Sequence, residues 1–104
     1  MHSVMHWNGT GDDLNDDTRD HQLEALLAEL QTAPYGYGEV SVFDDSTGWA
    51  VTAFRGGGVM LYNAELSSPM SHLKDADPMT IWRILVMQGT DAVLQLDWQP
   101  GPPP

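Results

Sequence analysis

Hydrophobic residues in the first third of the chain recur at the spacing of an amphipathic helix. Four leucines stand at positions i, i+3, i+4 and i+7 and so share one helical face: Leu23, Leu26, Leu27 and Leu30. Asp16 or Asp17 can cap the start of this helix, and Asp20 in its first turn is favoured by the helix dipole. Pro34 and the glycines that follow it end the helix.

Three segments rich in β-branched and aromatic residues come next, at 39–44, 49–55 and 59–63. The tight connection Asp44–Gly48 separates the first two segments, and Gly56–Gly58 turns the chain between the second and the third. Short strands joined by such turns predict an antiparallel meander.

A second helix is predicted directly after Asp77. Asp77 is a good N-cap, Pro78 suits the first helical position, and Gly89 suits the C-terminal cap. One face of this helix is apolar, and its residues are Met79, Trp82, Leu85 and Val86.

The remaining segments have weaker patterns and predict only short strands and a loop. A short first strand is predicted over Ser3–Asn8, a polar loop over Gly9–Asn15, and a short edge strand around Met70–Leu73. Ala92–Trp98 is predicted as a closing strand. The predicted order is therefore (β)-α-β-β-β-(β)-α-β, an α+β fold with an antiparallel sheet and two helices. We expect a single domain over residues 1–98 and a flexible proline-rich tail over 99–104.

The charge of the chain is strongly unbalanced. Fifteen acidic residues face four basic ones, for a formal net charge of −11. Such a protein should be repelled by nucleic acid and anionic membranes and should attract a basic protein partner. The alternative is that the acidity only confers solubility.

Several classes of protein are disfavoured by what the sequence contains. There is no cysteine, which excludes disulfides and thiol chemistry and suits a reducing cytoplasm. The start of the chain has no pattern of a secretory signal, and no apolar run approaches the ~20 residues of a membrane span. We therefore expect a cytoplasmic protein.

Candidate chemistry is weak. His2 and His6 with Asp12 and Asp13 could bind a metal, but their spacing matches no recognised ligand set. Gly56–Gly58 lies between two strands and lacks the Lys-Ser/Thr of a phosphate-binding loop. Paired aspartates in polar loops do not resemble a glycosidase site. We predict no catalytic residue, no metal site and no cofactor.

The hairpin turns suggest which residues share a face of the sheet. If Phe43 pairs with Trp49 and Phe54 with Val59, one face is aliphatic, with Val40, Val42, Ala50, Thr52, Phe54, Val59 and Leu61. The other face is aromatic, with Phe43, Trp49, Val51, Met60 and Tyr62, and is typical of an interface. Alternatively, a helix covers each face, and a register slip of one residue would reshuffle both sets.

Acidic residues border the aromatic set in sequence, which suits a basic protein partner. The predicted partner-binding residues are Phe43, Asp44, Asp45, Trp49, Tyr62, Glu65, Asp75 and Asp77. We expect charge reversal at the aspartates of this set to weaken binding more than reversal at Asp12 and Asp13. The acidic side of the first helix is the alternative contact surface.

The layout over about residues 20–98 resembles the first-numbered immunity-protein family of bacterial polymorphic toxin systems. The resemblance lies in His-Gln-Leu-Glu-Ala-Leu-Leu-Ala-Glu-Leu at 21–30, Gly-Gly-Gly-Val-Met-Leu-Tyr-Asn at 56–63, a helix with Trp82, and Val-Leu-Gln-Leu-Asp-Trp at 93–98. It implies a protein that binds and neutralises a cognate toxin, commonly a nuclease or nucleic-acid deaminase, inside the producing cell. It supplies no catalytic residues. The short loop before the second helix and the proline tail depart from the family pattern.

Two alternatives to an immunity protein remain open at the level of sequence. One is an acidic adaptor that binds a basic protein with no toxin involved. The other is a small enzyme or ligand carrier, which should have a deep pocket with perturbed ionisable groups.

Overall fold

The computed structural model describes residues 1–34, 38–67 and 69–101. Its strands form one antiparallel sheet in the order β2-β1-β3-β4-β5-β6-β7. The strands are β1 His2–Met5, β2 Gly11–Asp13, β3 Glu39–Asp44, β4 Trp49–Phe54, β5 Val59–Asn63, β6 Ser71–Leu73 and β7 Gln99–Pro100. The strands from β3 to β6 are consecutive neighbours, which confirms the predicted antiparallel meander.

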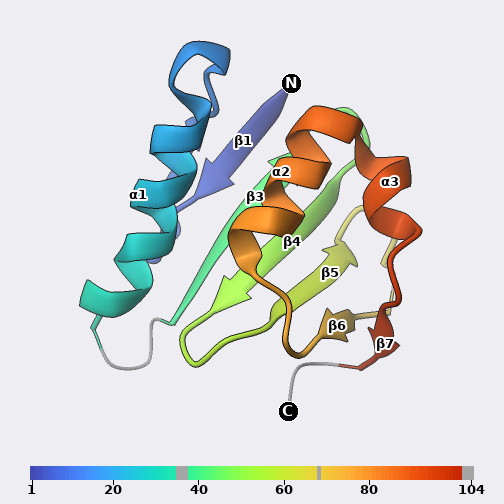
Figure 1. Cartoon of the computed structure of the whole chain (residues 1–104). Coiled ribbons are helices and arrows are strands. Elements are labelled where there is room, and N and C mark those ends of the chain that lie inside the picture. Colours follow the sequence, from blue (N-terminus) through green and yellow to red (C-terminus); the bar gives the residue numbers. More distant parts are fainter. Residues whose placement is uncertain (35–37, 68, 102–104) are drawn as a thin grey trace.

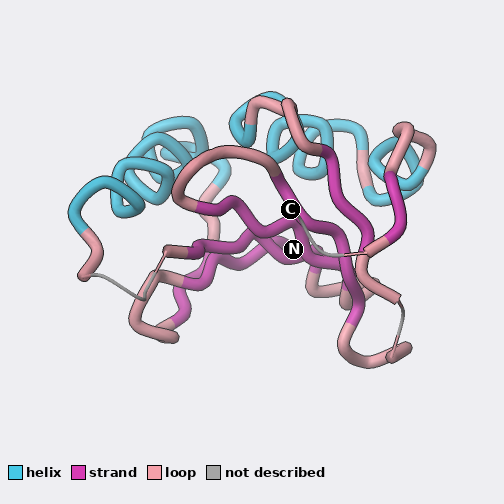
Figure 2. The backbone as a smooth tube through the Cα atoms, turned by 90° about the horizontal axis from the view of Figure 1, so that it is seen from below, coloured by secondary structure: helices cyan, strands magenta, loops and turns pink. Residues whose placement is uncertain are grey.

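The described helices all lie on one side of this sheet (Figures 1 and 2). They are the 3-10 helix η1 Asp16–Thr18 and the α-helices α1 Arg19–Thr32, α2 Pro78–Gln88 and α3 Thr90–Leu94. The α+β fold class is therefore confirmed. Helices cover one face of the sheet. No helix of the described residues lies on the other face.

The core lies between the helices and the covered face of the sheet. Leu23 and Leu26 of α1 and Trp82 and Leu85 of α2 are at most 1% exposed. Burial of each such side chain stabilises the fold by roughly 1.5–3 kcal/mol. Trp82 also donates its indole N–H to the carbonyl of Val51 at 3.0 Å, which fixes α2 over the central strand. Strand residues of this core are Val4, Val40, Val42, Val51, Ala53, Val59 and Leu61.

The start of α2 is as predicted, but the start of α1 is not: Asp16 and Asp17 lie in η1, and α1 begins at Arg19 after Thr18, with no side-chain cap. The carboxylate of Asp77 accepts from the Met79 N–H at 3.2 Å and caps the start of α2, as predicted. At the end of α1, Arg55 donates from Nε to the carbonyl of Leu30 at 2.7 Å and from its guanidinium to the carbonyl of Ala33. This contact ties the end of β4 to α1, because arginine satisfies carbonyls that a helix end leaves free.

Two segments differ from their predicted structure at the ends of the sheet. The predicted loop 9–15 contains β2, which pairs with β1 as an edge strand. The predicted closing strand 92–98 instead contains most of α3, where Val93 is fully buried and Leu96 packs against the core. Gly89 has a φ of 98°, which ends α2 and lets the chain start this new helix.

The predicted tail also differs. Gln99–Pro100 form the edge strand β7 beside β6, where proline is tolerated because one side of an edge strand needs no N–H. Residues 102–104 of that predicted tail, and Gly36 of the predicted turn, lie outside the described residues.

The register of β4 is one residue away from the predicted one. Phe43 pairs with Ala50, not Trp49, and Ala53 rather than Phe54 pairs with Val59. The side chains of β4 therefore exchange faces, because strand residues alternate. Trp49 and Val51 lie on the covered face, while Ala50, Thr52 and Phe54 lie on the other.

Candidate functional site

The face of the sheet opposite the helices is apolar at its centre. We call it the open face, and its large side chains are Met5, Phe43, Phe54, Met60 and Tyr62. Met5 is 40% exposed, and the other four are partly buried. Aromatic and methionine side chains of this kind are enriched in protein interfaces.

Register places four of these side chains in two rows across the sheet, while Phe54 pairs with Glu39. One row runs Ser3, Phe43, Ala50, Tyr62, and the next runs Met5, Ser41, Thr52, Met60. The small members of each row lie in the middle: Ala50 and Thr52 are 1% exposed and Ser41 is 7% exposed. The larger neighbours cover these small residues, and the hydroxyls of Ser41 and Thr52 satisfy each other at 2.7 Å. The open face is therefore a continuous apolar layer.

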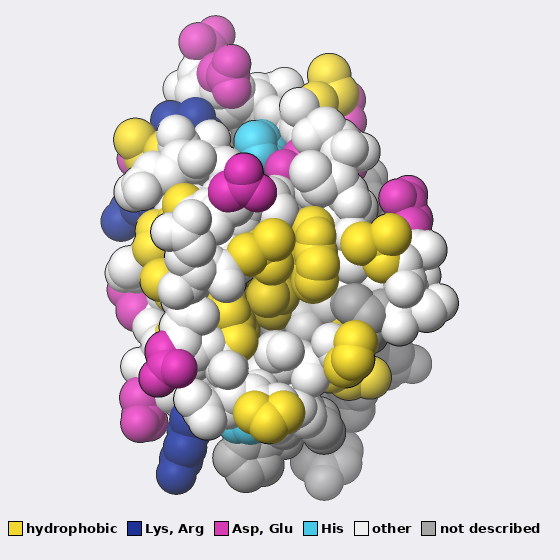
Figure 3. Space-filling model, turned by 90° about the vertical axis from the view of Figure 1, so that its right-hand side faces the viewer, with side chains coloured by type: hydrophobic (Ala, Val, Ile, Leu, Met, Phe, Trp, Pro, Cys, Tyr) yellow, Lys and Arg dark blue, Asp and Glu magenta, His cyan; other side chains and the backbone are white. Residues whose placement is uncertain are grey.

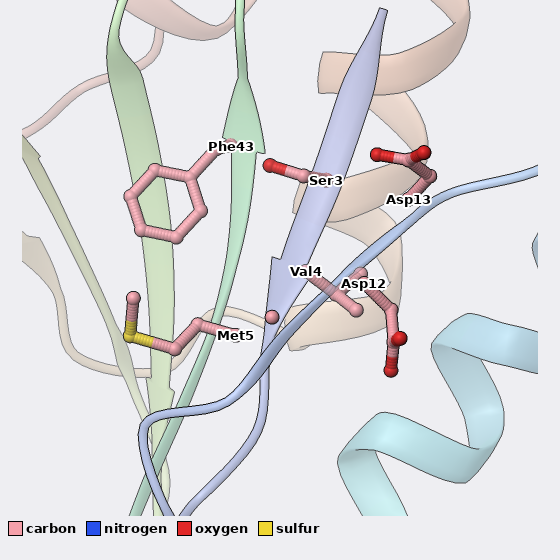
Figure 4. Close-up of a pocket in the computed structure, with 7 residues that line it drawn as sticks. Ser3, Val4, Met5, Asp12, Asp13 and Phe43 are labelled. Atoms are coloured by element: carbon pink, nitrogen blue, oxygen red, sulfur yellow. The ribbon is translucent and has the colours of Figure 1, made fainter.

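A depression of about 390 Å³ lies at the β1 side of the open face. Figure 4 shows Met5 and Phe43 next to each other, with Ser3 on β1 and the aspartates on β2. The depression is lined by Ser3, Val4, Met5, Gly11, Asp12, Asp13 and Phe43. It forms because Gly11 carries no side chain and Ser3 only a short one. The depression combines an apolar wall with carboxylates.

The strands carry no lysine or arginine, and every strand residue is described. The open face has carboxylates at its margin: Asp13 pairs with Ser3 at one edge, and Glu39 begins β3. Asp45 follows β3, and its carboxylate accepts from the hydroxyl of Ser3 at 2.7 Å. The acidic residues at this margin therefore have no strand lysine or arginine beside them, and the one histidine that the strand register places on this face is His72, opposite Met60.

Carboxylates are concentrated at one end of the molecule. Several contacts gather the elements there: Asp45 N–H donates to the Met1 carbonyl at 3.0 Å, and Leu14 N–H to the His2 carbonyl at 2.9 Å. Eight of the fifteen acidic residues belong to this acidic end, namely Asp13, Asp16, Asp17, Asp20, Asp44, Asp45, Glu65 and Asp91. The acidic end also holds Arg19, and Arg83 pairs there with Asp20 at 3.5 Å. The glycine-turn end carries Glu39, Asp75 and Asp77 together with Arg55 and Lys74. The eight carboxylates and two arginines of the acidic end leave a formal charge of −6, against −1 at the glycine-turn end.

Asp44 is the buried member of the acidic end and is 7% exposed. One carboxylate oxygen accepts from the Ser46 hydroxyl at 2.6 Å and the Ser46 N–H at 3.1 Å, and the other accepts from the Thr90 hydroxyl at 2.5 Å. Burial alone would raise the pKa of Asp44, but these hydrogen bonds outweigh it and hold the pKa at about 2. The carboxylate joins the β3–β4 turn to the start of α3.

His6 joins β1 to two other elements. Its Nε2 lies 2.6 Å from a carboxylate oxygen of Asp12 on β2, and its Nδ1 lies 2.6 Å from a carboxylate oxygen of Glu29 on α1. Both partners accept hydrogen bonds, so the ring fits best as an imidazolium with two N–H donors. The hydrogen bonds to Asp12 and Glu29 raise the pKa of His6 above its ordinary value. Among the described residues, no group of three or more ligating side chains could hold a metal ion.

A further apolar surface lies on the side of the molecule that carries α3 and β5 to β7. Figure 3 shows hydrophobic side chains in the centre of this side, with acidic side chains and also lysine and arginine side chains toward its border. Segments here include three exposed hydrophobic residues: Leu66 at 66%, Met70 at 49% and Leu94 at 39% exposed.

The structure separates the predicted partner-binding residues. Phe43 and Tyr62 lie in one row of the open face, whereas Trp49 packs against the covered core. The strand register places Asp44, Asp45 and Glu65 at the acidic end, and Asp75 and Asp77 at the opposite end. Asp44 and Asp77 serve the fold, as the buried network and the N-cap of α2. Asp45, Glu65 and Asp75 are exposed.

The sequence does not predict the role of Met5 or the bridge formed by His6. Met5 falls in the predicted first strand, but nothing in the sequence places β1 beside β3. His6 and Glu29 are 23 positions apart, and their contact depends on how α1 packs on the sheet. Only the proximity of His6 to acidic residues was visible.

Two other depressions lie outside the Phe43–Tyr62 region, and Phe54 lines one of them. One, of about 440 Å³, lies between the end of α1 and the glycine turn, and the other, of about 410 Å³, lies between Met1 and Val86. The two groups with shifted pKa values, His6 and Asp44, line neither of these depressions nor the one at β1. Helices long and apolar enough to cross a membrane are absent from the described residues.

Comparisons with known proteins leave the family open. No protein-family model matches the chain, and neither a curated protein nor a solved structure matches it.

Proposed function

We propose that this protein is an immunity protein that binds a basic toxin domain and neutralises it in the cytoplasm of the producing cell. The toxin would be a nuclease or a nucleic-acid deaminase. Enzymes of that kind need a positively charged cleft because their substrate is a polyanion. The acidic protein would occlude this cleft and exclude the nucleic acid.

The observation that carries the proposal is the distribution of carboxylates. Thirteen of the fifteen acidic residues, all except Glu29 and Asp44, are exposed. Eight of the fifteen lie at the acidic end, where Arg83 pairs with Asp20 at 3.5 Å. A potential concentrated at one end steers a basic partner into contact and can raise its association rate ~10- to 1,000-fold. The resemblance to the immunity family points the same way.

The test begins with the tagged full-length protein, captured from the native cell at moderate salt, and with mass spectrometry of what co-purifies. The gene of a stoichiometric partner is then expressed with and without this protein. We expect the partner to arrest growth alone and to become harmless when the two are expressed together. A partner that is not toxic alone would support an acidic adaptor instead. If no partner is recovered while the toxin gene is expressed, a small enzyme or ligand carrier would be favoured.

Two matched variants test the role of the acidic end. The double substitution Asp17→Asn, Glu65→Gln removes two exposed carboxylates there, and Glu24→Gln, Asp75→Asn removes two exposed carboxylates outside it. Both variants have the same net charge. We expect the first to slow association with the partner more than the second. Equal association rates would contradict a specific role of the acidic end.

A further inference from the structure

We propose that the open face is the docking surface for the partner, a basic protein that places apolar side chains on the Phe43–Tyr62 layer. Its lysine or arginine side chains would meet the carboxylates at the margin of the face. The inference rests on the proposed function only in taking the partner to be a basic protein. Three features of the described residues support it.

The first feature is the apolar layer itself. Phe43 and Tyr62 lie on either side of Ala50, and Met5 and Met60 lie on either side of the Ser41–Thr52 pair. Because the small central residues are almost inaccessible, the layer has no polar group at its centre that a partner would leave unsatisfied. A closed apolar centre with a polar margin is the usual arrangement of a protein interface.

The second feature is the charge around this layer. Asp13, Glu39 and Asp45 are exposed at its margin, and the strands beneath it have no lysine or arginine. A cationic partner therefore meets attraction at the margin and no strand lysine or arginine that would repel it.

The third feature is the depression beside Phe43. Met5 and Phe43 form an apolar wall, and Asp13 stands on the opposite side of the same depression. A long basic side chain can lay its methylene groups along such a wall and direct its charged head to the carboxylate. An arginine could also stack on the ring of Phe43.

A second copy of this chain fits the open face less well. Two copies, each with a net charge of −11, would bring the carboxylates of both margins close together. Like charges placed opposite each other across an interface are repulsive, and neither copy has a strand lysine or arginine to offset them. The charge therefore favours a basic partner over self-association.

Random peptides displayed on phage test this surface without knowledge of the toxin. The library is selected on the immobilised full-length protein at moderate salt, and the leading peptides are synthesised for affinity measurement. We expect them to combine lysine or arginine with aromatic or aliphatic residues. Met5→Lys and Met60→Lys should each weaken the binding of these peptides by about tenfold or more, the loss expected at a central interface position.

Met87→Lys is the matched control, because it makes the same substitution on α2, where Met87 is 64% exposed. We expect it to leave peptide affinity within about twofold, in line with a position outside the interface. Circular dichroism and thermal unfolding check that each variant is folded. Met5 is itself 40% exposed, so a lysine can reach solvent there.

Several results would overturn the docking surface. One is equal peptide affinity for the wild type, Met5→Lys and Met60→Lys, and another is a loss of peptide affinity only with Leu66→Lys on the α3 side. A selection that does not enrich peptides with basic and apolar residues would also overturn it, as would a wild-type dimer that Met60→Lys dissociates. The toxin assay gives a separate answer. Peptide binding at the open face without toxin neutralisation removes only the proposed function. Neutralisation by a Met5→Lys, Met60→Lys protein with unchanged toxin affinity removes only the docking surface.

Discussion

Two ionisable side chains have environments that their neighbours in sequence do not reveal. Asp44 stands at a hairpin tip in sequence, yet its carboxylate is buried by the hydroxyl groups of Ser46 and Thr90. His6 stands near the start of the chain, yet it bridges β2 and α1. The pKa of each side chain is shifted from its ordinary value, so both should contribute to stability in a way that depends on pH.

Asp44→Asn should destabilise the fold by ~1–3 kcal/mol at neutral pH, because an amide nitrogen replaces one of two carboxylate oxygens that accept hydrogen bonds. The pKa of Asp44 is lowered from 3.8 to about 2, so its contribution is present above pH 3.8 and disappears as the pH falls through about 2. Urea denaturation between pH 2 and 7 measures this dependence. The exposed Asp97→Asn control should change stability by less than ~0.5 kcal/mol, and an equal loss in both variants would contradict the buried network.

His6→Gln should remove a component of stability that is greatest at mildly acidic pH. The pKa of His6 is raised above 6.5, so its stabilising contribution is complete below pH 6.5 and is lost as the pH rises through the folded-state pKa. Thermal unfolding from pH 5.5 to 8.5 measures the effect. The wild type should lose more stability over this range than His6→Gln, whereas exposed His21→Gln should behave as the wild type. Parallel pH profiles for wild type and His6→Gln would exclude the bridge.

The strands and helices themselves could largely be predicted from sequence, but their register could not. The alternation in β3 and β5 correctly places Phe43, Met60 and Tyr62 on one face. β4 is apolar on both sides, so its own pattern cannot say which face is buried. The deciding information lies in the two turns: each shifts the register by one residue, so β3 and β5 differ from the predicted register by two residues. A shift of two residues leaves every side chain of β3 and β5 on its predicted face, because strand side chains alternate.

Gly48→Ala should cost more stability than Gly57→Ala, and the difference tests the first of these turns. Both glycines have positive φ, at 81° and 104°. A Cβ at Gly48 would also lie 3.0 Å from the side-chain oxygen of Asn63, which is buried and held by hydrogen bonds, whereas one at Gly57 would meet nothing within 4 Å. Each alanine should lose ~1–2 kcal/mol of stability to the left-handed conformation, and Gly48→Ala should lose more. Chemical denaturation measures both, and equal losses would contradict the close packing of the β3–β4 turn against Asn63.

The closing segment shows a second limit of prediction at this scale. Val93 and Leu96 are three residues apart, which suits a helix, but the neighbouring Leu94 and Trp98 also give the alternation of a strand. Packing decides between these patterns, because Val93 enters the core and the indole N–H of Trp98 bonds to its carbonyl at 2.7 Å. Because this segment forms a helix, the strand that pairs with β6 at the edge of the sheet is β7.

The whole molecule combines a large net charge with an uneven distribution of that charge. Composition alone predicts the net charge of −11, but only the fold gathers segments 13–20, 44–45, 65 and 91 at one end. Carboxylates held close together repel one another, and this repulsion opposes folding. Added salt should therefore raise the midpoint of thermal unfolding of the wild type, since salt screens the repulsion between exposed charges.

Charge reversal at the two ends should separate local crowding from net charge. Glu65→Lys lies at the acidic end and Asp75→Lys follows Lys74 at the other, and both leave a formal net charge of −9. Relief of ~0.5 kcal/mol of repulsion should raise the midpoint of Glu65→Lys by roughly 2–4 °C, while Asp75→Lys should gain nothing because it places two lysines together. Differential scanning calorimetry at low and high salt distinguishes the two. An equal rise of the unfolding midpoint in both variants would mean that total charge alone limits stability. A rise in Glu65→Lys alone would mean that the carboxylates concentrated at the acidic end, which we propose steers the partner, destabilise the fold.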